Sequence, residues 1–586
     1  MKKLWKYMRD YRREGILAPL FKLLEASLEL LVPLVMAQII DTGIANGDRG
    51  FILSRCGILA ALAAVGLVCS ITAQYFAAKA SVGFAAKLRN TLFKHIQSLS
   101  YSKLDTQGTG TLIARITGDI NQVQSGMNLA LRLLLRSPFV VFGAMIMAFT
   151  IDVKAALVFV VTIPLLSIVV FGIMLWSIPM YKKVQARLDK VLGITRENLS
   201  GVRVIRAFCK EDEKRREFGE RNAALTKLQL MVGRVSAAMN PATYIMINLG
   251  IAVLIYVGAL RVDSGILTQG QVVALYNYMS QILVELVKLA SLIITITKAL
   301  ACAGRVSAAL DVESDMHGAD TMPKEIDTDE EVRFENVEFG YATGGEPALS
   351  GISFSVKKGE TMGIIGGTGS GKSSLVSLIP RFYDATGGHV YIKENDVKDY
   401  PLGALREMVG MVPQKAVLFK GTIRENLRWG SADATEEEME RALSDAQALE
   451  IVKAKPEGLD SPVAQNGKNL SGGQRQRLTI ARALIKKPEI LILDDSASAL
   501  DYATDLALRR SLAALSYKPT VFIVSQRASS ILHADKIAVL DEGKMVGLGT
   551  HDELMQTCPV YREIYYSQYE QEVKRDAYAE SKQLNA

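Results

Sequence analysis

The stretch that decides the fold of the second half of the chain is Gly366-Gly367-Thr368-Gly369-Ser370-Gly371-Lys372-Ser373. It follows a short apolar run, TMGII at 361–365, and opens a helix-like run, SSLVSLI at 373–379. Glycines let backbone N–H groups close around phosphate oxygens, and the start of a helix adds a favourable dipole. The pattern predicts a nucleotide phosphate loop in which Lys372 reaches the β- and γ-phosphates, Ser373 ligates Mg²⁺ and Ser374 completes the binding set.

A second motif lies more than a hundred residues further on. The apolar run ILIL at 490–493 ends in two carboxylates, Asp494 and Asp495. A run of this kind is typical of a strand buried on both faces of a parallel sheet, and an acid at its carboxyl end is where Mg²⁺ is held. We therefore expect Asp494 to be a Mg²⁺ ligand.

A third motif, Ser471-Gly472-Gly473-Gln474, follows Leu470 and opens the run RQRLTIARAL. A serine and two glycines at the start of a helix form another phosphate-binding N-terminus. One nucleotide does not need two such sites, so this motif indicates that a second chain supplies the other nucleotide.

The first half of the chain is different in character. The whole sequence of 586 residues is 49% hydrophobic and 22% charged, and the apolar residues gather in the first 300 positions. They form apolar runs of about 20 residues or more, which is long enough to cross about 30 Å of hydrocarbon. Basic stretches at 87–95 and 181–190 place both ends of the region in the cytoplasm. The six predicted spans lie near 16–40, 52–80, 130–150, 154–178, 241–261 and 271–297.

The two long cytoplasmic excursions, about 79–129 and 179–239, carry apolar residues at helical spacing, so we expect the membrane helices to continue beyond the bilayer and reverse there. The net charge of +7 is too small for this length to favour nucleic acid as a partner. Five scattered cysteines without a CxxC pair predict free thiols.

Several charged residues fall in or near the predicted hydrocarbon, where an unpaired charge is costly. Glu25 and Glu29, four residues apart, share one helix face. They either line an inward cavity that favours cationic amphiphiles or pair with other residues of the bundle, and the sequence leaves both alternatives open. The same question applies to the other three, Lys79, Glu285 and Lys288.

Together, the three motifs and the six spans resemble a half-transporter of the ATP-binding cassette (ABC) superfamily, of the exporter type. The resemblance implies a six-helix membrane bundle fused to an α/β nucleotide-binding domain, with ATP and Mg²⁺ as cofactors. It assigns Tyr341 to adenine stacking, Gln414 to sensing the γ-phosphate beside Mg²⁺, and Asp501, in Ser498-Ala499-Leu500-Asp501, to the dimer interface. Residues 88–105 with 109–124, and residues 197–218, resemble the two cytoplasmic loops that dock on nucleotide domains.

Two positions depart from the pattern of active members. Asp495 stands where the general base is Glu, and Gln526, in VFIVSQR at 521–527, stands where a histidine contacts the γ-phosphate. Misplacing a catalytic group by about 1 Å costs about 10²-fold in rate. We therefore expect this chain's own site to bind ATP and hydrolyse it poorly, as in the degenerate half of a heterodimeric exporter.

Other readings stay open at this stage. A homodimeric exporter or lipid flippase with a slow Asp base, and a non-transporting ATP-dependent sensor partner, both fit the motifs. The substrate class is amphipathic, covering drugs, lipids or peptides, and the expected location is the bacterial inner membrane. The expected segments are an interfacial helix at 1–14, a membrane domain at 15–303, an acidic linker at 304–331, a nucleotide domain at 332–565 and a polar tail at 566–586.

Overall fold

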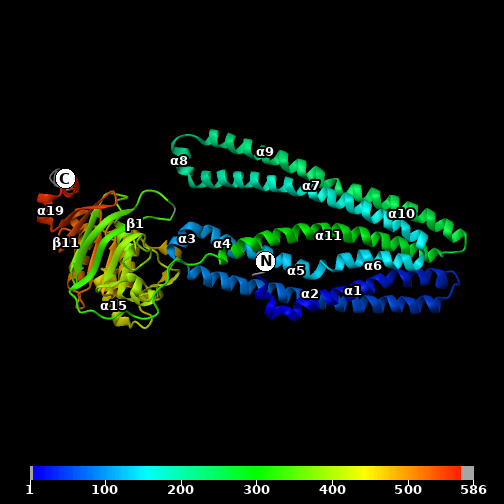
Figure 1. Ribbon diagram of the computed structural model, residues 1–586, viewed down its shortest axis with the longest axis horizontal. Helices are drawn as coiled ribbons and strands as arrows, with labels where there is room; N and C mark the ends of the chain where they lie inside the picture. The colour runs from blue at the N-terminus through cyan, green and yellow to red at the C-terminus, as the bar shows by residue number, and fades with distance from the viewer. Residues whose placement is uncertain (1–3, 343, 569–586) are drawn as a thin grey trace. The chain divides into compact units, whose positions relative to one another are not determined.

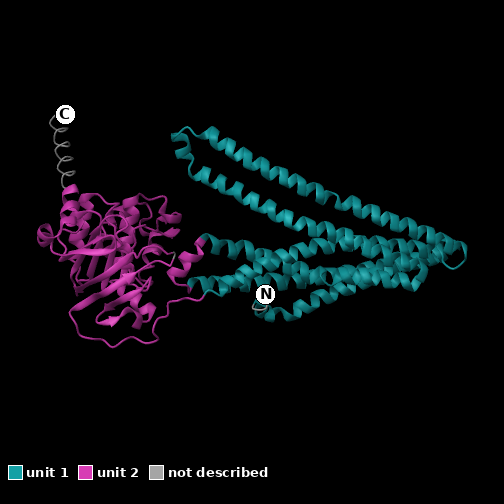
Figure 2. Cartoon of the chain, turned by 45° about the horizontal axis from the view of Figure 1, so that its top comes forward, with its two compact units in different colours: residues 1–97, 110–312 teal, residues 98–109, 313–586 magenta. Residues whose placement is uncertain are grey.

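A computed structural model describes residues 4–342 and 344–568. The chain divides into two compact units, coloured separately in Figure 2: residues 1–97 with 110–312, and residues 98–109 with 313–586. The predicted polar tail from residue 569 onward, and the first three residues of the predicted interfacial helix, lie outside the described residues. Each unit is described by itself.

The first unit is entirely helical among its described residues (Figure 1), and six of its helical runs are long and apolar enough to cross a membrane. Each run contains one of the predicted spans, so the prediction of six membrane helices is confirmed. The elements are η1 (Leu4–Tyr11), α1 (Arg12–Gln38), η2 (Ile39–Ile44), α2 (Arg49–Gln97), α4 (Thr109–Ala114), η3 (Arg115–Asp119), α5 (Ile120–Leu133), α6 (Arg136–Ile151), α7 (Val153–Ser200), α8 (Val202–Ala207), α9 (Glu211–Ala237), α10 (Met239–Asp263) and α11 (Gln269–Leu310).

The membrane helices continue well past the apolar spans. The 49 residues of α2 and the 48 residues of α7 each measure about 70 Å at 1.5 Å per residue. A hydrocarbon core is about 30 Å thick, so each helix extends far beyond it. This confirms the prediction of long extensions. Pro33 lies inside α1, and Pro164 and Pro179 lie inside α7.

Small residues let these helices approach closely. Ala144, Ala155 and Ala156 are fully buried in the core of the bundle. At Gly126 of α5 an added Cβ would lie 2.2 Å from the Cβ of Ala299 on α11. Close backbone approach of this kind replaces the hydrophobic drive that lipid cannot supply.

The predicted interfacial segment is a 3₁₀ helix, η1, that packs on α2. Leu4 and Met8 are buried in one cluster with Phe84 and Leu88. Leu4 and Met8 are four residues apart, and the apolar side that they form faces the protein.

The predicted linker is shorter than expected. α11 runs on to Leu310, because Val306 and Ala309 continue its buried face against α2 and α5. At the other end, strand β1 (Glu330–Phe339) already begins within the stretch assigned to the linker. The predicted boundaries at 304 and 331 therefore do not coincide with the ends of these elements.

The second unit contains two larger sheets. One is antiparallel, in the order β2-β1-β4-β5, and the other has the order β12-β11-β3-β10-β9-β6 and is parallel except for β12. A third, two-stranded sheet pairs β7 with β8. The remaining strands are β2 (Leu349–Lys357), β3 (Thr361–Gly366), β4 (Gly387–Ile392), β5 (Asn395–Asp396), β6 (Val409–Val412), β7 (Gly421–Thr422), β8 (Pro462–Val463), β9 (Ile490–Asp494), β10 (Thr520–Val524), β11 (Lys536–Asp541) and β12 (Lys544–Gly549).

Helices surround these sheets. The central strands β3, β9 and β10 are almost wholly buried, as expected for parallel strands covered on both faces. The helices of this unit are α3 (Tyr101–Gln107), α12 (Lys372–Leu378), η4 (Val397–Asp399), α13 (Leu402–Met408), α14 (Ile423–Leu427), α15 (Glu436–Asp445), α16 (Leu449–Lys453), η5 (Gly458–Asp460), η6 (Gln465–Gly467), α17 (Gly472–Leu484), α18 (Tyr502–Ala513), η7 (Ala528–Ser530) and α19 (His551–Thr557).

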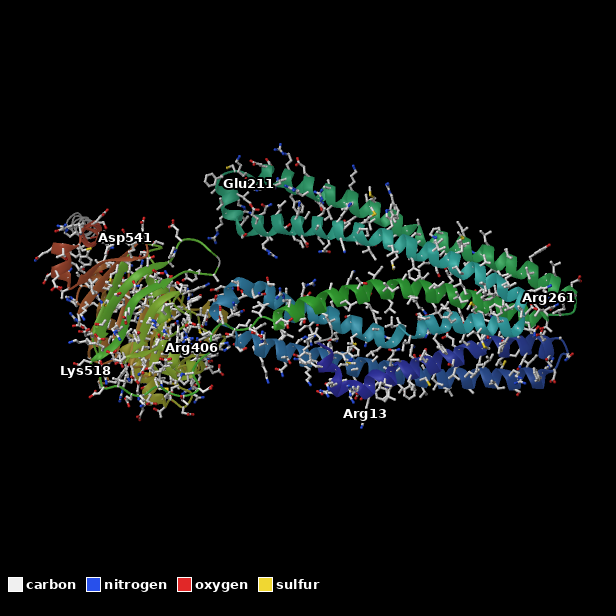
Figure 3. All side chains as sticks on the ribbon, in the orientation of Figure 1. Arg13, Glu211, Arg261, Arg406, Lys518 and Asp541 are labelled. Carbon is white, nitrogen blue, oxygen red and sulfur yellow. The ribbon has the colours of Figure 1, made fainter. Side chains whose placement is uncertain are left out.

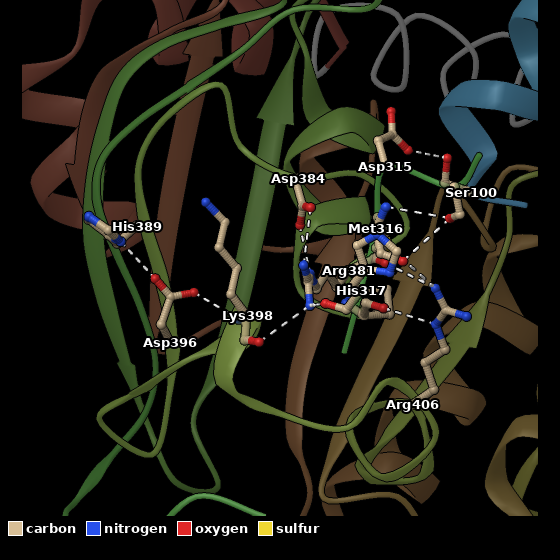
Figure 4. A network of polar contacts seen from close by, with 12 residues as sticks. Ser100, Asp315, Met316, His317, Arg381, Asp384, His389, Asp396, Lys398 and Arg406 are labelled. Carbon is tan, nitrogen blue, oxygen red and sulfur yellow. Dashed lines mark hydrogen bonds and ion pairs between the residues drawn. The ribbon is translucent and has the colours of Figure 1, made fainter. Parts of the chain in front are cut away.

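Residues 98–109, which come from the first predicted cytoplasmic loop, belong to this second unit. The ring of Tyr101 packs 4.7 Å from that of Phe382, and Ser100 donates to Asp315 at 2.5 Å. Figure 4 shows this contact beside the buried Arg381, whose guanidinium binds both carboxylate oxygens of Asp384. Residues 98–109 are thus held to the rest of the second unit, which we call the nucleotide unit, by an aromatic contact and a hydrogen bond to a carboxylate.

At the far end of the bundle from α8, polar contacts close the helix connections. Arg261, at the end of α10 (Figure 3), pairs with Asp152, which also accepts the N–H of Ala155 at 2.8 Å and caps α7. Asp41 of η2 accepts the Thr268 hydroxyl at 2.5 Å and the Gly270 N–H at 2.7 Å. Asp41 therefore supplies an acceptor to the start of α11.

Replacing Asp41 by Ala should lower the free energy of unfolding by about 1 to 2 kcal/mol. The variant lacks the carboxylate that accepts hydrogen bonds at the start of α11. Thermal unfolding of the detergent-purified protein measures the effect. The matched control is Asp263→Ala, which removes an exposed carboxylate at the end of α10. Equal unfolding midpoints for the two variants would contradict the role given to Asp41.

Candidate nucleotide-binding site

The predicted phosphate loop connects β3 to α12. Lys372 lies under it, 8% exposed, and donates from Nζ to the carbonyl oxygens of Gly366 at 2.9 Å and Gly367 at 2.6 Å. Burial lowers the pKa of this ammonium. Gly371 has φ +92°, and an added Cβ would lie 2.5 Å from the carbonyl oxygen of Ala348. The loop therefore needs glycine at this position and has a cation at its centre.

The rest of the loop, Thr368, Gly369 and Ser370, forms the turn between strand and helix. The Ser370 hydroxyl lies 3.4 Å from the Lys372 ammonium. Ser370 is buried, whereas Thr368 and Gly369 are exposed. The exposed part is where a phosphate chain has access.

The acid pair lies beside this loop. Asp494 ends β9, is 5% exposed and accepts the Ser373 hydroxyl at 2.9 Å. Burial raises the pKa of Asp494, with a further upward contribution from the neighbouring charge of Asp495. The sheet thus brings together two predicted Mg²⁺ ligands that are 121 positions apart in the chain.

Asp495 has a backbone conformation that is unusual for a residue other than glycine, with φ +46°. Its N–H donates to the carbonyl of Val524 at 2.9 Å, which holds the turn to the end of β10. Its carboxylate accepts from Gln414 Nε2 at 3.3 Å. Burial raises the pKa of Asp495. Gln414 and the acid pair, both predicted from sequence, are therefore neighbours.

Tyr341 follows β1 and is 44% exposed. Its hydroxyl is 2.8 Å from that of Ser374 in α12, which ties it to the phosphate loop. Its ring meets Phe339 and Tyr383 edge-on, at centroid distances of 4.8 and 5.5 Å. One face of the ring can therefore remain available to a flat ligand.

The third motif, Ser471–Gln474, which we call the signature motif, forms a group separate from the phosphate loop. Ser471 caps α17, with its hydroxyl accepting from Gln474 N at 3.2 Å and Gln474 Oε1 accepting from Ser471 N at 3.0 Å. An added Cβ at Gly473 would lie 3.1 Å from the carbonyl oxygen of Ala499, so the motif lies against the loop that leads to Asp501. Gly472, next to it, has open space around its Cα.

Asp501 caps α18 by accepting the N–H and the hydroxyl of Thr504, both at 2.9 Å. These hydrogen bonds lower the pKa of Asp501. Among the residues that the structure describes, no hydrogen bond, ion pair or ring contact joins Ser471–Gln474 or Asp501 to the phosphate loop. The predicted residues thus form two groups rather than one.

Gln526 is exposed just after β10, and its backbone carbonyl accepts from Gln568 Nε2 at 2.7 Å. Two neighbours were not predicted. Arg527 carries a positive charge that acts on the Asp495 carboxylate, and Tyr383 joins Tyr341 to Asp105 of α3 through its hydroxyl, at 2.7 Å. The sequence signal for Tyr383 is weak, because only the fold brings 341, 383 and 105 together.

The charged residues that the sequence places in or near the membrane spans form ion pairs. Lys22 donates to Glu25 at 2.6 Å and Arg136 to Glu29 at 2.5 Å, while Lys79 lies 3.0 Å from Glu14. The structure therefore supports pairing for Glu25 and Glu29. Each carboxylate has a cation beside it, which agrees with the pairing alternative.

Comparison with known proteins gives two family matches. The model described as ABC transporter transmembrane region matches residues 16–286, and the model described as ABC transporter matches residues 349–498. An uncharacterized ABC transporter ATP-binding protein of Mycobacterium tuberculosis is 36% identical over 571 residues, covering 96% of this chain and 97% of that protein.

Two further proteins are similar over most of their length. The ATP-dependent lipid A-core flippase of Syntrophus aciditrophicus is 32% identical over 489 residues, covering 83% of this chain and 81% of that protein. The structure of a bacterial Atm1-family ABC exporter with ATP bound superimposes with a TM-score of 0.79 at 24% identity, covering 95% of this chain and 98% of that one. This last likeness concerns the fold.

The six membrane runs, the phosphate loop with its acid pair and the matches over both units lead to one conclusion. The chain is a multi-pass membrane protein with an ATP-binding domain on the cytoplasmic side, and it belongs to the ABC transporter superfamily as an exporter-type half-transporter.

Proposed function

We propose that the chain is the degenerate-site subunit of a heterodimeric ATP-driven exporter that moves amphipathic substrates out of the cytoplasm or the inner leaflet of the inner membrane. The observation that carries the proposal is the separation of the predicted residues into two groups on one nucleotide unit. The phosphate-loop group carries both departures from the active pattern, whereas the signature group is intact. A chain of this kind has half of each of two sites.

The phosphate-loop group fits ATP with Mg²⁺. The loop has a buried ammonium at its centre and exposed backbone around it, and Tyr341 offers a half-exposed ring tied to α12. The Ser373 hydroxyl and the Asp494 carboxylate, 2.9 Å apart, are oxygen ligands of the type that Mg²⁺ prefers. Bound Mg²⁺ would neutralise charge on the transferred phosphoryl group.

Asp495 and Gln526 account for slow hydrolysis in our proposal. The Asp495 carboxylate is one methylene shorter than the Glu of active members, and its strained backbone and bond to Gln414 hold it in place. A base held about 1 Å too far from its water loses about 10²-fold in rate. The Gln526 amide cannot carry the charge of an imidazolium ion, so a second catalytic contribution is absent from the same site.

The signature group serves the partner's nucleotide. Ser471 and Gln474 stabilise each other at the start of α17, a helix of 13 residues whose first N–H groups point to phosphate. Asp501 lies in the adjacent loop, in agreement with its proposed place at the dimer interface. The substrate class rests on the membrane bundle and on the name of the flippase relative.

Lys372→Ala should weaken nucleotide binding at this chain's own site by about ten- to a hundredfold, because charge-assisted hydrogen bonds of about 1.5–3 kcal/mol are lost. Labelling of this subunit by a photoreactive ATP analogue measures the effect. The control is Lys358→Ala, an exposed lysine of the same unit. Unchanged labelling would refute the assignment of the loop.

Ser471→Arg should lower steady-state hydrolysis by the assembled pair about tenfold or more, because a bulky cation replaces the phosphate-facing helix start. Asp495→Asn should cost about twofold or less, because its base contributes little. Both rates are measured on the complex purified with its co-expressed partner. Ser516→Arg places the same cation at an exposed position after α18 and serves as control. In a homodimer the two losses would be equal, and that result would refute the degenerate site.

Restoring the active pattern should raise turnover at this chain's own site. In a complex already carrying Ser471→Arg, which silences the partner's site, Asp495→Glu with Gln526→His should raise the residual rate by up to about 10²-fold. Asp495→Glu with Gln526→Asn is the matched control and should raise it less. If the double replacement leaves the residual rate unchanged, the two departures are not the cause of slow hydrolysis.

A further inference from the structure

A cavity of about 510 Å³ opens among α1, α6 and α11 within the membrane unit. Three charged residues, Glu29, Glu285 and Lys288, are part of its wall. Glu25, one turn before Glu29, is not part of the wall. The cavity therefore distinguishes between the two acids that the sequence had grouped on one face.

The carboxylate of Glu285 is not available to a ligand, because it is buried and already hydrogen-bonded. Its side chain is 4% exposed, and it accepts from Arg136 at 2.5 Å, Ser137 at 2.8 Å and Lys288 at 3.0 Å. A buried carboxylate with three donors is satisfied, and its negative charge is matched by the two cations. Its role is to hold Arg136 and Lys288 in position.

Glu29 and Lys288 remain open to the cavity. Arg136 bonds Glu29 through Oε2, and the side chain of Glu29 is 42% exposed. The side chain of Lys288 is 46% exposed, and one of its three N–H groups is used on Glu285. The cavity thus presents an accessible carboxylate from α1 and an accessible ammonium from α11, joined through Arg136 and Glu285.

The rest of the wall is amphipathic. Gln281 lies one turn before Glu285, and within the described part of the chain its buried Oε1 has no hydrogen-bond partner. A buried acceptor without a donor is unfavourable, and a ligand N–H or O–H that bonds to it removes this cost. Apolar side chains, among them Val32, Pro33 and Val284, line the remainder.

We propose that this cavity is a binding site for a zwitterionic amphiphile. The ammonium of the ligand lies at Glu29, its phosphate or carboxylate at Lys288, a donor at Gln281, and its apolar part along α1. The inference rests on the proposed export function and names the substrate class. A ligand with a single charge satisfies one of the two open groups and faces the like charge of the other, so neither cations nor anions alone match the wall.

Binding of three short-chain lipids with the same tails tests the site by native mass spectrometry of the full complex in a neutral maltoside detergent without nucleotide. The probes are dioctanoyl phosphatidylethanolamine, dioctanoyl phosphatidic acid and dioctanoyl trimethylammonium-propane. The zwitterion should bind about tenfold more tightly than either of the others. A tailless zwitterion, leucyl-leucine, distinguishes a peptide source from a lipid source: binding as tight as that of the lipid assigns the site to peptides.

Variants of the two open groups should give a crossed pattern. Lys288→Gln should weaken the zwitterion and the anion about tenfold and leave the cation unchanged, whereas Glu29→Gln should weaken the zwitterion and the cation and leave the anion unchanged. The matched controls are Lys298→Gln, an exposed lysine of α11 outside the cavity, and Glu25→Gln. Neither control should change any affinity.

Lys288→Gln carries the test if Glu29→Gln unfolds, because Glu285 keeps Arg136 and Ser137 as partners; thermal unfolding checks both. The proposal is overturned if Lys288→Gln and Lys298→Gln bind all probes alike, or if the cation binds most tightly. Since the measurement needs no ATP, these outcomes concern the site alone. Failure of ATP-driven transport of every probe, with the crossed pattern intact, would contradict the proposed export function instead.

Discussion

Hydrocarbon offers no hydrogen bonds, and the rest of the membrane unit depends on this constraint. Backbone groups are satisfied within long helices, and charges are satisfied by one another. Arg136 shows the result most clearly, because its guanidinium lies between Glu29 of α1 and Glu285 of α11 while its own helix is α6. One cation thus joins three helices, and the side chains of Glu29 and Lys288 stay partly open to the cavity.

The nucleotide unit is organised by its largely parallel sheet. Strands β3, β9 and β10 are adjacent, so their carboxyl ends bring the phosphate loop, the acid pair and the turn of Gln526 to one edge. Residues separated by more than a hundred positions thereby become neighbours, as Ser373 and Asp494 do. The signature helix starts elsewhere, against the loop of Asp501, and this separation is the physical basis for treating one chain as parts of two sites.

The segment 98–109 follows α2 in the chain and belongs to the second unit. It leaves the end of α2, folds with the nucleotide unit, and places Tyr101 against Phe382 and Asp105 on Tyr383. Tyr383 in turn meets Tyr341, the residue proposed to stack on the base. These ring contacts and the hydrogen bond of Asp105 all lie within the second unit.

The sequence by itself determined the number of membrane helices, the phosphate loop, the acid pair and the family, because these depend on local patterns: apolar run length, glycine spacing and a strand ending in acids. The boundary that it set for the membrane domain, at 303, falls inside α11, which continues to Leu310 because Val306 packs on α2 and α5. It also left Glu25 and Glu29 as an equivalent pair. Glu25 pairs with Lys22 within α1, three residues away. Only the tertiary structure decided that Glu29 shares Arg136 of α6 and faces a cavity, because this choice depends on which helices become neighbours.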